Sequence, residues 1–193
     1  TPFYKDRAAG KLVMPDDETL ANMYSITQEL GEKSGMPAYE ISNHARSGHQ
    51  SVHNLGYWRY KEYIGIGPGA HSRIASDNKR RAMNQIESPR KWIDSVRSKG
   101  HGNKNNVLLD QQSTSLEVLL TGLRLSEGVP AKRFNKFSNK SLGKILNHPA
   151  VTPALDNKLI MWDKHTLRTT LNGRLVLNAI IRTLEQAIND SVY

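Results

Sequence analysis

Apolar residues recur every three or four positions in several stretches of the chain, the spacing that gives an α-helix one hydrophobic face. The first such stretch follows Pro15, where Asp16 is a suitable N-cap and Gly31 and Gly35 end the pattern. Its apolar face is expected to comprise Leu20, Met23, Tyr24, Thr27 and Leu30. Further helices are predicted after Ser88 and over residues 113–125, 131–137, 141–146 and 173–189.

Shorter stretches alternate apolar and polar residues and predict strands. These are residues 36–42, 63–67 and 80–86, and a hairpin formed by 158–162 and 166–169. The helix after Ser88 is expected to turn Trp92, Ile93 and Val96 inward. Residues 100–106 are rich in glycine and asparagine and are predicted to form a loop.

This pattern predicts a fold of the class α/β plus α, with two domains. Residues 1–108 show a helix-to-strand step that is typical of (β/α) barrels. Residues 109–193 consist of helices, a small hairpin and a final helix, which suggests a winged-helix-like helical domain.

Composition narrows the function classes. The chain has no cysteine, which excludes disulfides, thiolate zinc sites, iron–sulfur ligation and cysteine nucleophiles within it. Apolar runs of about 20 residues, which a transmembrane helix needs, are absent from the sequence, so a cytoplasmic protein is predicted. The net charge of +9 invites a nucleic-acid interpretation, but the basic excess is spread evenly, and the densest stretch, 124–144, is explained as well by a solvated helix.

Histidines and aromatic residues concentrate in one segment. Four of the seven histidines, His44, His49, His53 and His71, fall within 28 residues of one another. Tyr39, Tyr57, Trp58, Tyr60 and Tyr63 lie in the same region. Imidazole is a common haem and metal ligand, so this segment is a candidate site. The alternative is that His44 and His49 merely cap turns or are solvated, and no pair has the spacing of a helical zinc motif.

The sharpest motif is HNLGYW at residues 53–58. A loop histidine, His53, stands beside an asparagine that can orient it, and Tyr57 and Trp58 offer flat surfaces on which a macrocycle can stack. The competing interpretation is a hydrogen-bonded histidine in an aromatic core, which is the commoner arrangement.

A glycine-rich run, GIGPGA at residues 65–70, superficially fits a dinucleotide-binding fingerprint. The context does not fit, because the residues that follow Ala70 predict a strand where that motif needs a helix. Two interpretations remain open: a backbone that a bound adenosyl group approaches closely, or a tight turn without a ligand. Glu40 is the only carboxylate near the histidines on its predicted strand and supports no mechanism alone.

Several motifs together resemble a known family. The runs YEISN, ARSGH, HNLGYW and YIGIGPGAH are similar to those of the oxygen-independent coproporphyrinogen III oxidase family of radical SAM proteins. Within that family, HNLGYW resembles the signature of the haem chaperone (HemW-type) branch. GLRLSEGV and LNGRLVLNAII resemble the C-terminal domain of the family.

This resemblance implies a partial (β/α) barrel followed by a helical C-terminal domain, with S-adenosyl-L-methionine (SAM) and a 4Fe-4S cluster bound in the full-length protein. The family holds its cluster with a CxxxCxxC motif in the N-terminal half, and this chain has no cysteine. We therefore expect a C-terminal portion without the cluster-binding half, inactive by itself in radical chemistry.

The resemblance also implies roles for particular residues. His53 matches the signature histidine and is the expected ligand of haem iron, with Asn54, Tyr57 and Trp58 completing the haem contact. Gly69, Ala70 and His71 match a strand end near bound SAM, and Tyr39 and Glu40 are expected to face the same cavity. Arg80 and Arg81 are candidate partners of haem propionates.

Three functions are weighed at this point. The first is a haem chaperone that binds haem and passes it to haem-accepting proteins, and the second is oxidative decarboxylation of coproporphyrinogen III to protoporphyrinogen IX. Nucleic-acid binding by the basic C-terminal domain is the third and rests on fold analogy alone. The sequence leaves open whether the protein forms a homodimer or contacts a membrane surface.

Overall fold

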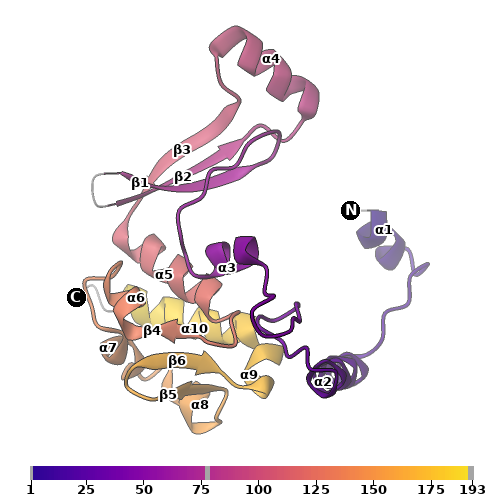
Figure 1. Cartoon of the computed structure of the whole chain (residues 1–193), viewed down its shortest axis with the longest axis vertical. Helices are drawn as coiled ribbons and strands as arrows, with labels where there is room; N and C mark the ends of the chain where they lie inside the picture. The colour runs from indigo at the N-terminus through magenta and orange to yellow at the C-terminus, as the bar shows by residue number, and fades with distance from the viewer. Residues whose placement is uncertain (1, 77–78, 191–193) are drawn as a thin grey trace.

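The C-terminal half of the chain folds around two helices with regularly spaced apolar residues. This computed structural model describes residues 2–76 and 79–190. Helix α5 (Gln111–Gly122) starts at Asp110, whose carboxylate accepts a hydrogen bond from the backbone N–H of Ser113 at 2.7 Å. Helix α10 (Leu177–Asn189) packs against α5 at the centre of the core (Figure 1). Its buried face consists of Leu177, Ile180, Ile181, Leu184, Ala187 and Ile188.

A small antiparallel sheet and several short helices complete this core. The strands lie in the order β4 (Val129–Pro130), β6 (Thr166–Thr169) and β5 (Ile160–Trp162), which confirms the predicted hairpin. The short helices are α6 (Ala131–Asn135), α7 (Leu142–Leu146) and α8 (Thr152–Asp156). Together these elements bury large side chains that include Phe134, Leu142, Ile145, Ile160 and Leu167.

The last apolar stretch forms two helices, whereas its spacing predicted one helix over residues 173–189. Helix α9 (Leu171–Leu175) begins at Thr170, whose hydroxyl accepts a hydrogen bond from the N–H of Gly173 at 3.1 Å. The backbone leaves helical geometry at Val176, with φ −117° and ψ 23°. Gly173 lies so close to the carbonyl of Leu159 that any Cβ there would overlap it. The close packing of Gly173 on Leu159 therefore fixes the direction of α9, and α10 starts as a separate helix after Val176.

A second three-stranded sheet extends away from the core and has helix α4 (Pro89–Lys99) at its far end (Figure 1). Its antiparallel strands lie in the order β1 (His71–Ser76), β2 (Lys79–Gln85) and β3 (Asn103–Leu109). The predicted strand over 80–86 is confirmed, but the predicted loop over 100–106 is wrong from Asn103 onward. Asparagine is a poor strand former in general, yet here pairing with β2 overrides that preference.

Two predicted strands, 36–42 and 63–67, are wrong. Each forms only isolated bridges among the described residues, namely Ala38 with His44, Glu40 with Leu125, and Tyr63 with Arg73. A strand needs a continuous backbone partner, and neither segment has one in the part of the chain that the structure describes. Both segments are therefore irregular, although they run close to the elements that carry the site.

Helices α1 (Pro2–Ala8) and α2 (Asp17–Lys33) lie at the margin of the molecule (Figure 1). The predicted N-cap of α2 is confirmed, since the Asp16 carboxylate accepts a hydrogen bond from the N–H of Thr19 at 2.8 Å. No residue of α2 is buried, so its apolar face is not packed as the spacing predicts. Leu20, Met23, Ile26 and Leu30 are between 41% and 59% exposed.

Helix α4 differs in part from its prediction as well. Trp92 and Val96 are half-buried as expected, but Ile93 is 43% exposed and Ser95 is the buried residue. The Trp92 indole N–H donates to the Gln85 side chain at 3.1 Å, which fixes α4 on β2. A helix attached to one end of a narrow sheet has little surface to cover, so Ile93 has no neighbour to bury it.

The outer sheet is joined to the core through Arg80. This side chain is only 7% exposed and lies against the rings of Tyr60 and Phe137, each 5.2 Å from the guanidinium carbon. It donates to the Tyr60 carbonyl at 3.0 Å and forms an ion pair with Glu62 at 3.2 Å. Protein groups therefore already contact Arg80, but its Nε and Nη1 atoms are buried without a hydrogen-bond partner among the described residues, and a contact with propionates stays a prediction.

Among the described residues, no helix has the length and apolar character that crossing a membrane requires.

A carboxylate at Glu127 connects α3 (Val52–Trp58) to the core and gives a pH-dependent prediction. Arg59 donates to it at 2.9 and 2.7 Å and Arg133 at 3.1 Å, and these hydrogen bonds, that of Arg59 first, lower the pKa of Glu127. The ionised carboxylate thus stabilises the fold above its ordinary pKa of 4.5, and this contribution is lost as pH falls through the lowered value.

We expect Glu127→Gln to lower the free energy of unfolding at neutral pH by up to about 1 kcal/mol, since an exposed pair is screened by solvent. The variant should also lose less stability than the parent when pH falls below 4.5. Urea denaturation at several pH values measures both effects. Glu185→Gln, an exposed carboxylate on α10, is the control, and an equal pH response in both variants would refute the prediction.

Candidate functional site

The HNLGYW motif folds as helix α3, not as the loop that the sequence predicted. Ser51 caps the helix, because its hydroxyl accepts a hydrogen bond from the N–H of Asn54 at 3.2 Å. One helical turn places His53 and Tyr57 on the same face, where their rings meet edge to face with centroids 4.6 Å apart. The helix ends before Tyr60, whose φ of 56° turns the chain toward the core.

A cavity of about 360 Å³ lies between α3, α5 and the start of the outer sheet. It is lined by Asn54, Tyr57, Trp58, Tyr60, Tyr63, Arg73, Glu117, Leu120 and Thr121. Three of the four residues expected to contact haem therefore share one cavity. Four aromatic side chains in the lining give it the flat, apolar surfaces that small-molecule sites typically use.

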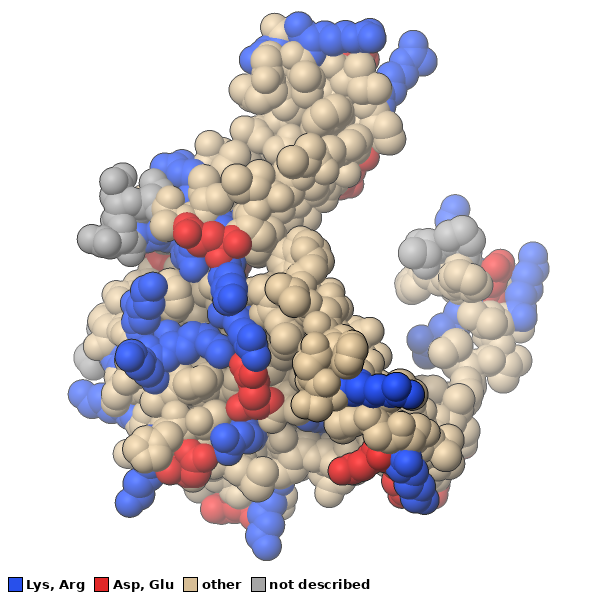
Figure 2. All heavy atoms as spheres, in the orientation of Figure 1, with Lys and Arg blue, Asp and Glu red and all other residues tan. Residues whose placement is uncertain are grey.

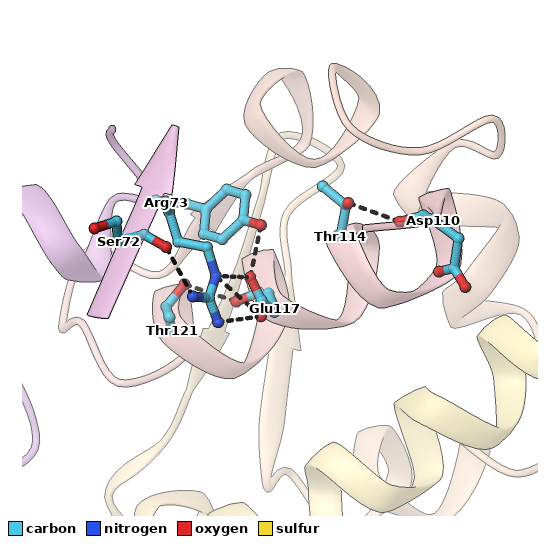
Figure 3. A network of polar contacts seen from close by, with 7 residues as sticks. Ser72, Arg73, Asp110, Thr114, Glu117 and Thr121 are labelled. Atoms are coloured by element: carbon cyan, nitrogen blue, oxygen red, sulfur yellow. Dashed lines mark hydrogen bonds and ion pairs between the residues drawn. The ribbon is translucent and has the colours of Figure 1, made fainter. Parts of the chain in front are cut away.

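The polar part of the cavity is an ion pair between Arg73 on β1 and Glu117 on α5. The Arg73 guanidinium donates to both carboxylate oxygens, with Nε to Oε2 at 2.9 Å and Nη2 to Oε1 at 2.8 Å (Figure 3). The Tyr60 hydroxyl donates to Oε2 of the same carboxylate at 2.7 Å. Hydrogen bonding to Glu117 raises the pKa of Arg73, so this cation stays charged at the cavity wall.

One side chain of the cavity, Trp58, retains an unused hydrogen-bond donor. The indole N–H of Trp58 is buried and has no hydrogen-bond partner among the described residues. Such a donor costs about 1–3 kcal/mol unless an acceptor reaches it. The Arg124 guanidinium, which does not belong to the cavity lining, lies 5.3 Å from the centre of the Trp58 ring. Burial, opposed by the charge of Arg73, raises the pKa of Tyr63, whose ring packs 4.2 Å from that of Tyr57.

His53 is exposed and does not line the cavity. The His53 ring contacts the ring of Tyr57, which does line the cavity. The exposed imidazole is therefore accessible to a ligand bound against α3. Tyr39 joins the same group, because its hydroxyl accepts a hydrogen bond from the Asn54 amide at 3.3 Å. The structure thus brings Tyr39 together with the HNLGYW residues.

The remaining candidates lie elsewhere. Glu40 is only 1% exposed, and its carboxylate accepts hydrogen bonds from the Asn43 side chain and, at 3.1 Å, from the Ser42 N–H. Gly69 and Ala70 form the turn that precedes β1, with the Gly69 N–H donating to the Ile86 carbonyl at 3.0 Å. His71 opens β1 and is exposed. The strand predicted after Ala70 is confirmed.

Sequence reasoning missed Arg73 and Glu117, the charged residues of the cavity. Glu117 gave a usable signal, since it is the single charged residue within the otherwise apolar and small-residue stretch 113–123. Arg73 gave none, because its role depends on how β1 meets α5. Among the described residues, no three histidine, aspartate or glutamate side chains cluster closely enough to hold a metal ion.

Comparison with known proteins identifies relatives of this chain. Residues 109–176 match the family described as HemN C-terminal domain. A zebrafish protein named "Radical S-adenosyl methionine domain-containing protein 1, mitochondrial" is 35% identical over 190 residues, covering 95% of this chain and 43% of that protein. A Bacillus subtilis protein named "Heme chaperone HemW" is 33% identical over 181 residues, covering 93% and 46%.

A solved structure shares the fold. It is described as "Coproporphyrinogen III oxidase (HemN) from Escherichia coli is a Radical SAM enzyme" and matches with a TM-score of 0.66 at 13% identity, over 89% of this chain and 42% of that one. At this identity the likeness concerns the fold alone. The chain spans less than half the length of the curated relatives described here.

The fold and the matched C-terminal domain define a portion of a radical SAM protein. This chain belongs to the HemN-related radical SAM family, with relatives named as the haem chaperone HemW and as radical SAM domain-containing protein 1. The resemblance inferred from the sequence motifs is confirmed.

Tyr60 provides a test of the charged side of the cavity. Burial, followed by the hydrogen bond and charge of Glu117, raises the pKa of Tyr60 well above its ordinary value of 10.0. Its neutral phenol therefore stabilises the fold below that pH, and stability falls as pH rises above it.

We expect Tyr60→Phe to lower the free energy of unfolding at neutral pH by about 1 kcal/mol, because one hydrogen bond is lost. The same variant should lose less stability than the parent above pH 10. Denaturation at neutral and alkaline pH compares them, with Tyr4→Phe, a tyrosine that is 74% exposed, as the matched control. If Tyr60→Phe and the parent lose stability equally in alkali, the protonated state assigned to Tyr60 is wrong.

Proposed function

We propose that this chain is part of a haem chaperone, with haem held at α3 and at the cavity between α3 and α5. One observation carries the proposal: Asn54, Tyr57 and Trp58 line a single cavity, and the exposed His53 contacts its Tyr57 wall. If a macrocycle stacks on these rings, the His53 imidazole can ligate its iron. The Trp58 N–H, which has no partner among the described residues, can donate to one of its polar substituents. The relatives named as haem chaperones support the same assignment.

In this proposal haem is cargo, and haem-accepting proteins are the partners that receive it. His53 is suited to reversible ligation of haem iron because its side chain is exposed. A ligand from the acceptor protein can therefore compete with His53 for the iron. The aromatic walls hold the ring by stacking, which is compatible with release, since no covalent attachment is required. Binding and release of haem in this proposal do not require the half of the protein that binds SAM and the 4Fe-4S cluster.

The family's cofactors, SAM and a 4Fe-4S cluster, differ from haem in how they relate to the residues of this chain. The chain has no cysteine, so its residues do not fit a 4Fe-4S cluster, and no chemistry is assigned to them through that group. For SAM, we propose that Gly69, Ala70 and His71, with Tyr39 and Glu40 more weakly, line part of a cavity completed by other segments of the protein. The close approach of Gly65 to the His71 backbone, which leaves no room for a Cβ, gives this turn a fixed shape in support of that role.

We further propose that residues 1–108 represent the last elements of a radical SAM barrel and a connecting region, and that residues 109–193 form a winged-helix-like helical C-terminal domain. The exposed apolar face of α2 and the segments near Ala38 and Tyr63, which form only isolated bridges among the described residues, support the first part, since both are suited to neighbours from a larger barrel. The helices with the β4-β6-β5 sheet support the second. Cytoplasm remains the predicted compartment, whereas the name of the zebrafish relative places that protein in mitochondria.

The enzymatic alternative is a coproporphyrinogen III oxidase, which the shared fold with HemN favours. It predicts that the protein encoded by the full reading frame, given coproporphyrinogen III, SAM and a reductant, forms protoporphyrinogen IX. We expect no product above a control without protein, and chromatography of the tetrapyrroles measures it. Product formation would replace the chaperone proposal by the oxidase.

Nucleic-acid binding receives no comparable support. Figure 2 shows Lys and Arg side chains scattered over this face and interspersed with acidic groups, not gathered into one stripe. Several of the basic residues are also occupied, as Arg59 and Arg133 are by Glu127.

The haem site is tested by titrating the chain with haem and following the Soret absorbance. We expect His53→Ala to weaken binding about tenfold or more, a loss equivalent to at least about 1.4 kcal/mol. His49→Ala is the matched control, because His49 is equally exposed in the preceding loop and should leave the spectrum unchanged. An unaltered Soret band and affinity in His53→Ala would remove the ligand assignment.

A further inference from the structure

A second concave surface includes Arg124, whose guanidinium lies 5.3 Å from the centre of the Trp58 ring. Two adjoining cavities of about 880 and 380 Å³ share Ile41, Arg124, Arg174, Leu175 and Val176 and form one groove. The groove runs between α2, residues 41–44 and the junction of α9 with α10. Its apolar floor comprises Leu20, Ala21, Ile41, Leu175, Val176 and Leu177.

Three guanidinium groups border this groove, from Arg124, Arg174 and Arg182. None of the three forms an ion pair with a carboxylate among the described residues, whereas Arg59, Arg73, Arg133 and Arg168 all do. Asp17 is the one acidic residue of the lining, at the α2 end. Three unpaired cations beside apolar side chains leave a local positive charge that the fold itself does not neutralise.

Two of these arginines are held in place. The Arg174 Nη2 donates to the Ser126 hydroxyl at 2.8 Å, and that hydroxyl donates to the Ala38 carbonyl at 2.5 Å. The Nε of Arg174 is buried without a hydrogen-bond partner among the described residues. Arg124 is fixed by its stacking on Trp58, at 5.3 Å. A positioned cation loses less conformational entropy on binding an anion than a mobile one.

The start of α10 adds to the same field. Its N-cap, Val176, makes no side-chain capping hydrogen bond, and Leu177, Asn178 and Ala179 from its first turn line the groove. The positive end of the helix dipole thus lies beside Arg182, one turn further along the helix. Guanidinium groups, a helix N-terminus and an apolar floor suit a ligand with a flat apolar body and carboxylates at its edge.

We propose that this groove binds the carboxylate edge of a tetrapyrrole, through Arg124, Arg174 and Arg182. The proposal rests on the proposed function, since it takes the same class of cargo, but it assigns a separate surface with a separate chemical task. Iron ligation belongs to His53 at α3, and recognition of the carboxylates belongs to the groove. Trp58 lines the cavity at α3 and Arg124 lines the groove, so the contact between these two side chains connects the two surfaces.

The test uses an iron-free ring, so that histidine ligation plays no part. Mesoporphyrin IX, with two carboxylates, and its neutral diamide are titrated into the chain and followed by porphyrin fluorescence. We expect Arg182→Gln and Arg124→Gln each to weaken mesoporphyrin binding about tenfold, the loss of one charge-assisted contact. The diamide should bind more weakly and should not respond to either substitution.

Arg97→Gln, on the remote helix α4, is the control for net charge, and circular dichroism checks that each variant is folded. Arg182 is exposed and without an ion pair, so its variant should fold normally. Equal binding by the parent and both groove variants would overturn the proposal, as would an equal loss in Arg97→Gln. Displacement of mesoporphyrin by inorganic phosphate at matched concentration would also overturn it, since that indicates a general anion site.

Titrating the same variants with haem separates this proposal from the previous one. If His53→Ala weakens haem binding while the groove variants bind mesoporphyrin normally, the groove assignment fails and the haem site stands. If the groove variants lose mesoporphyrin binding while His53→Ala leaves haem binding unchanged, the groove stands and the iron ligand is wrong.

Discussion

The pairing of Arg73 with Glu117 connects the two halves of the molecule at the point where the cavity forms. One partner belongs to a strand of the outer sheet and the other to the central helix of the core, so the two elements are fixed in orientation by a bidentate contact. Tyr60 adds a third bond to the same carboxylate, and its ring in turn packs on Arg80. The position of α3, and with it the aromatic walls of the cavity, depends on this charged centre.

How far the sequence predicts this arrangement depends on the range of the interactions involved. Helix α2, the α5 region and the hairpin β5-β6 follow from local spacing and capping residues, and all three are present. The strands expected at 36–42 and 63–67 are not, because a strand depends on neighbours that local sequence does not reveal. Residues 103–109 show the converse, as pairing with β2 makes a strand of an asparagine-rich run.

The candidate site shows the same division. The HNLGYW motif identified residues of the candidate site but not its helix α3, and the fold gathers Asn54, Tyr57 and Trp58 around one cavity. The charged residues of the lining, at positions 73 and 117, are distant in sequence, and only the tertiary structure brings them into contact. The surroundings of Arg80 depend on tertiary structure for the same reason, since only the structure reveals the two aromatic rings and Glu62 beside it.

The contact between Trp58 and Arg124 has a consequence for fluorescence. The chain has three tryptophans, and within residues 2–76 and 79–190 Trp58 alone has both a cation over its ring and a buried N–H without a hydrogen-bond partner. Indole emission responds to both of these neighbours. A chain in which Trp92 and Trp162 are replaced by phenylalanine therefore carries one intrinsic fluorophore, which lines the cavity at α3 and contacts Arg124 of the groove, with no added label.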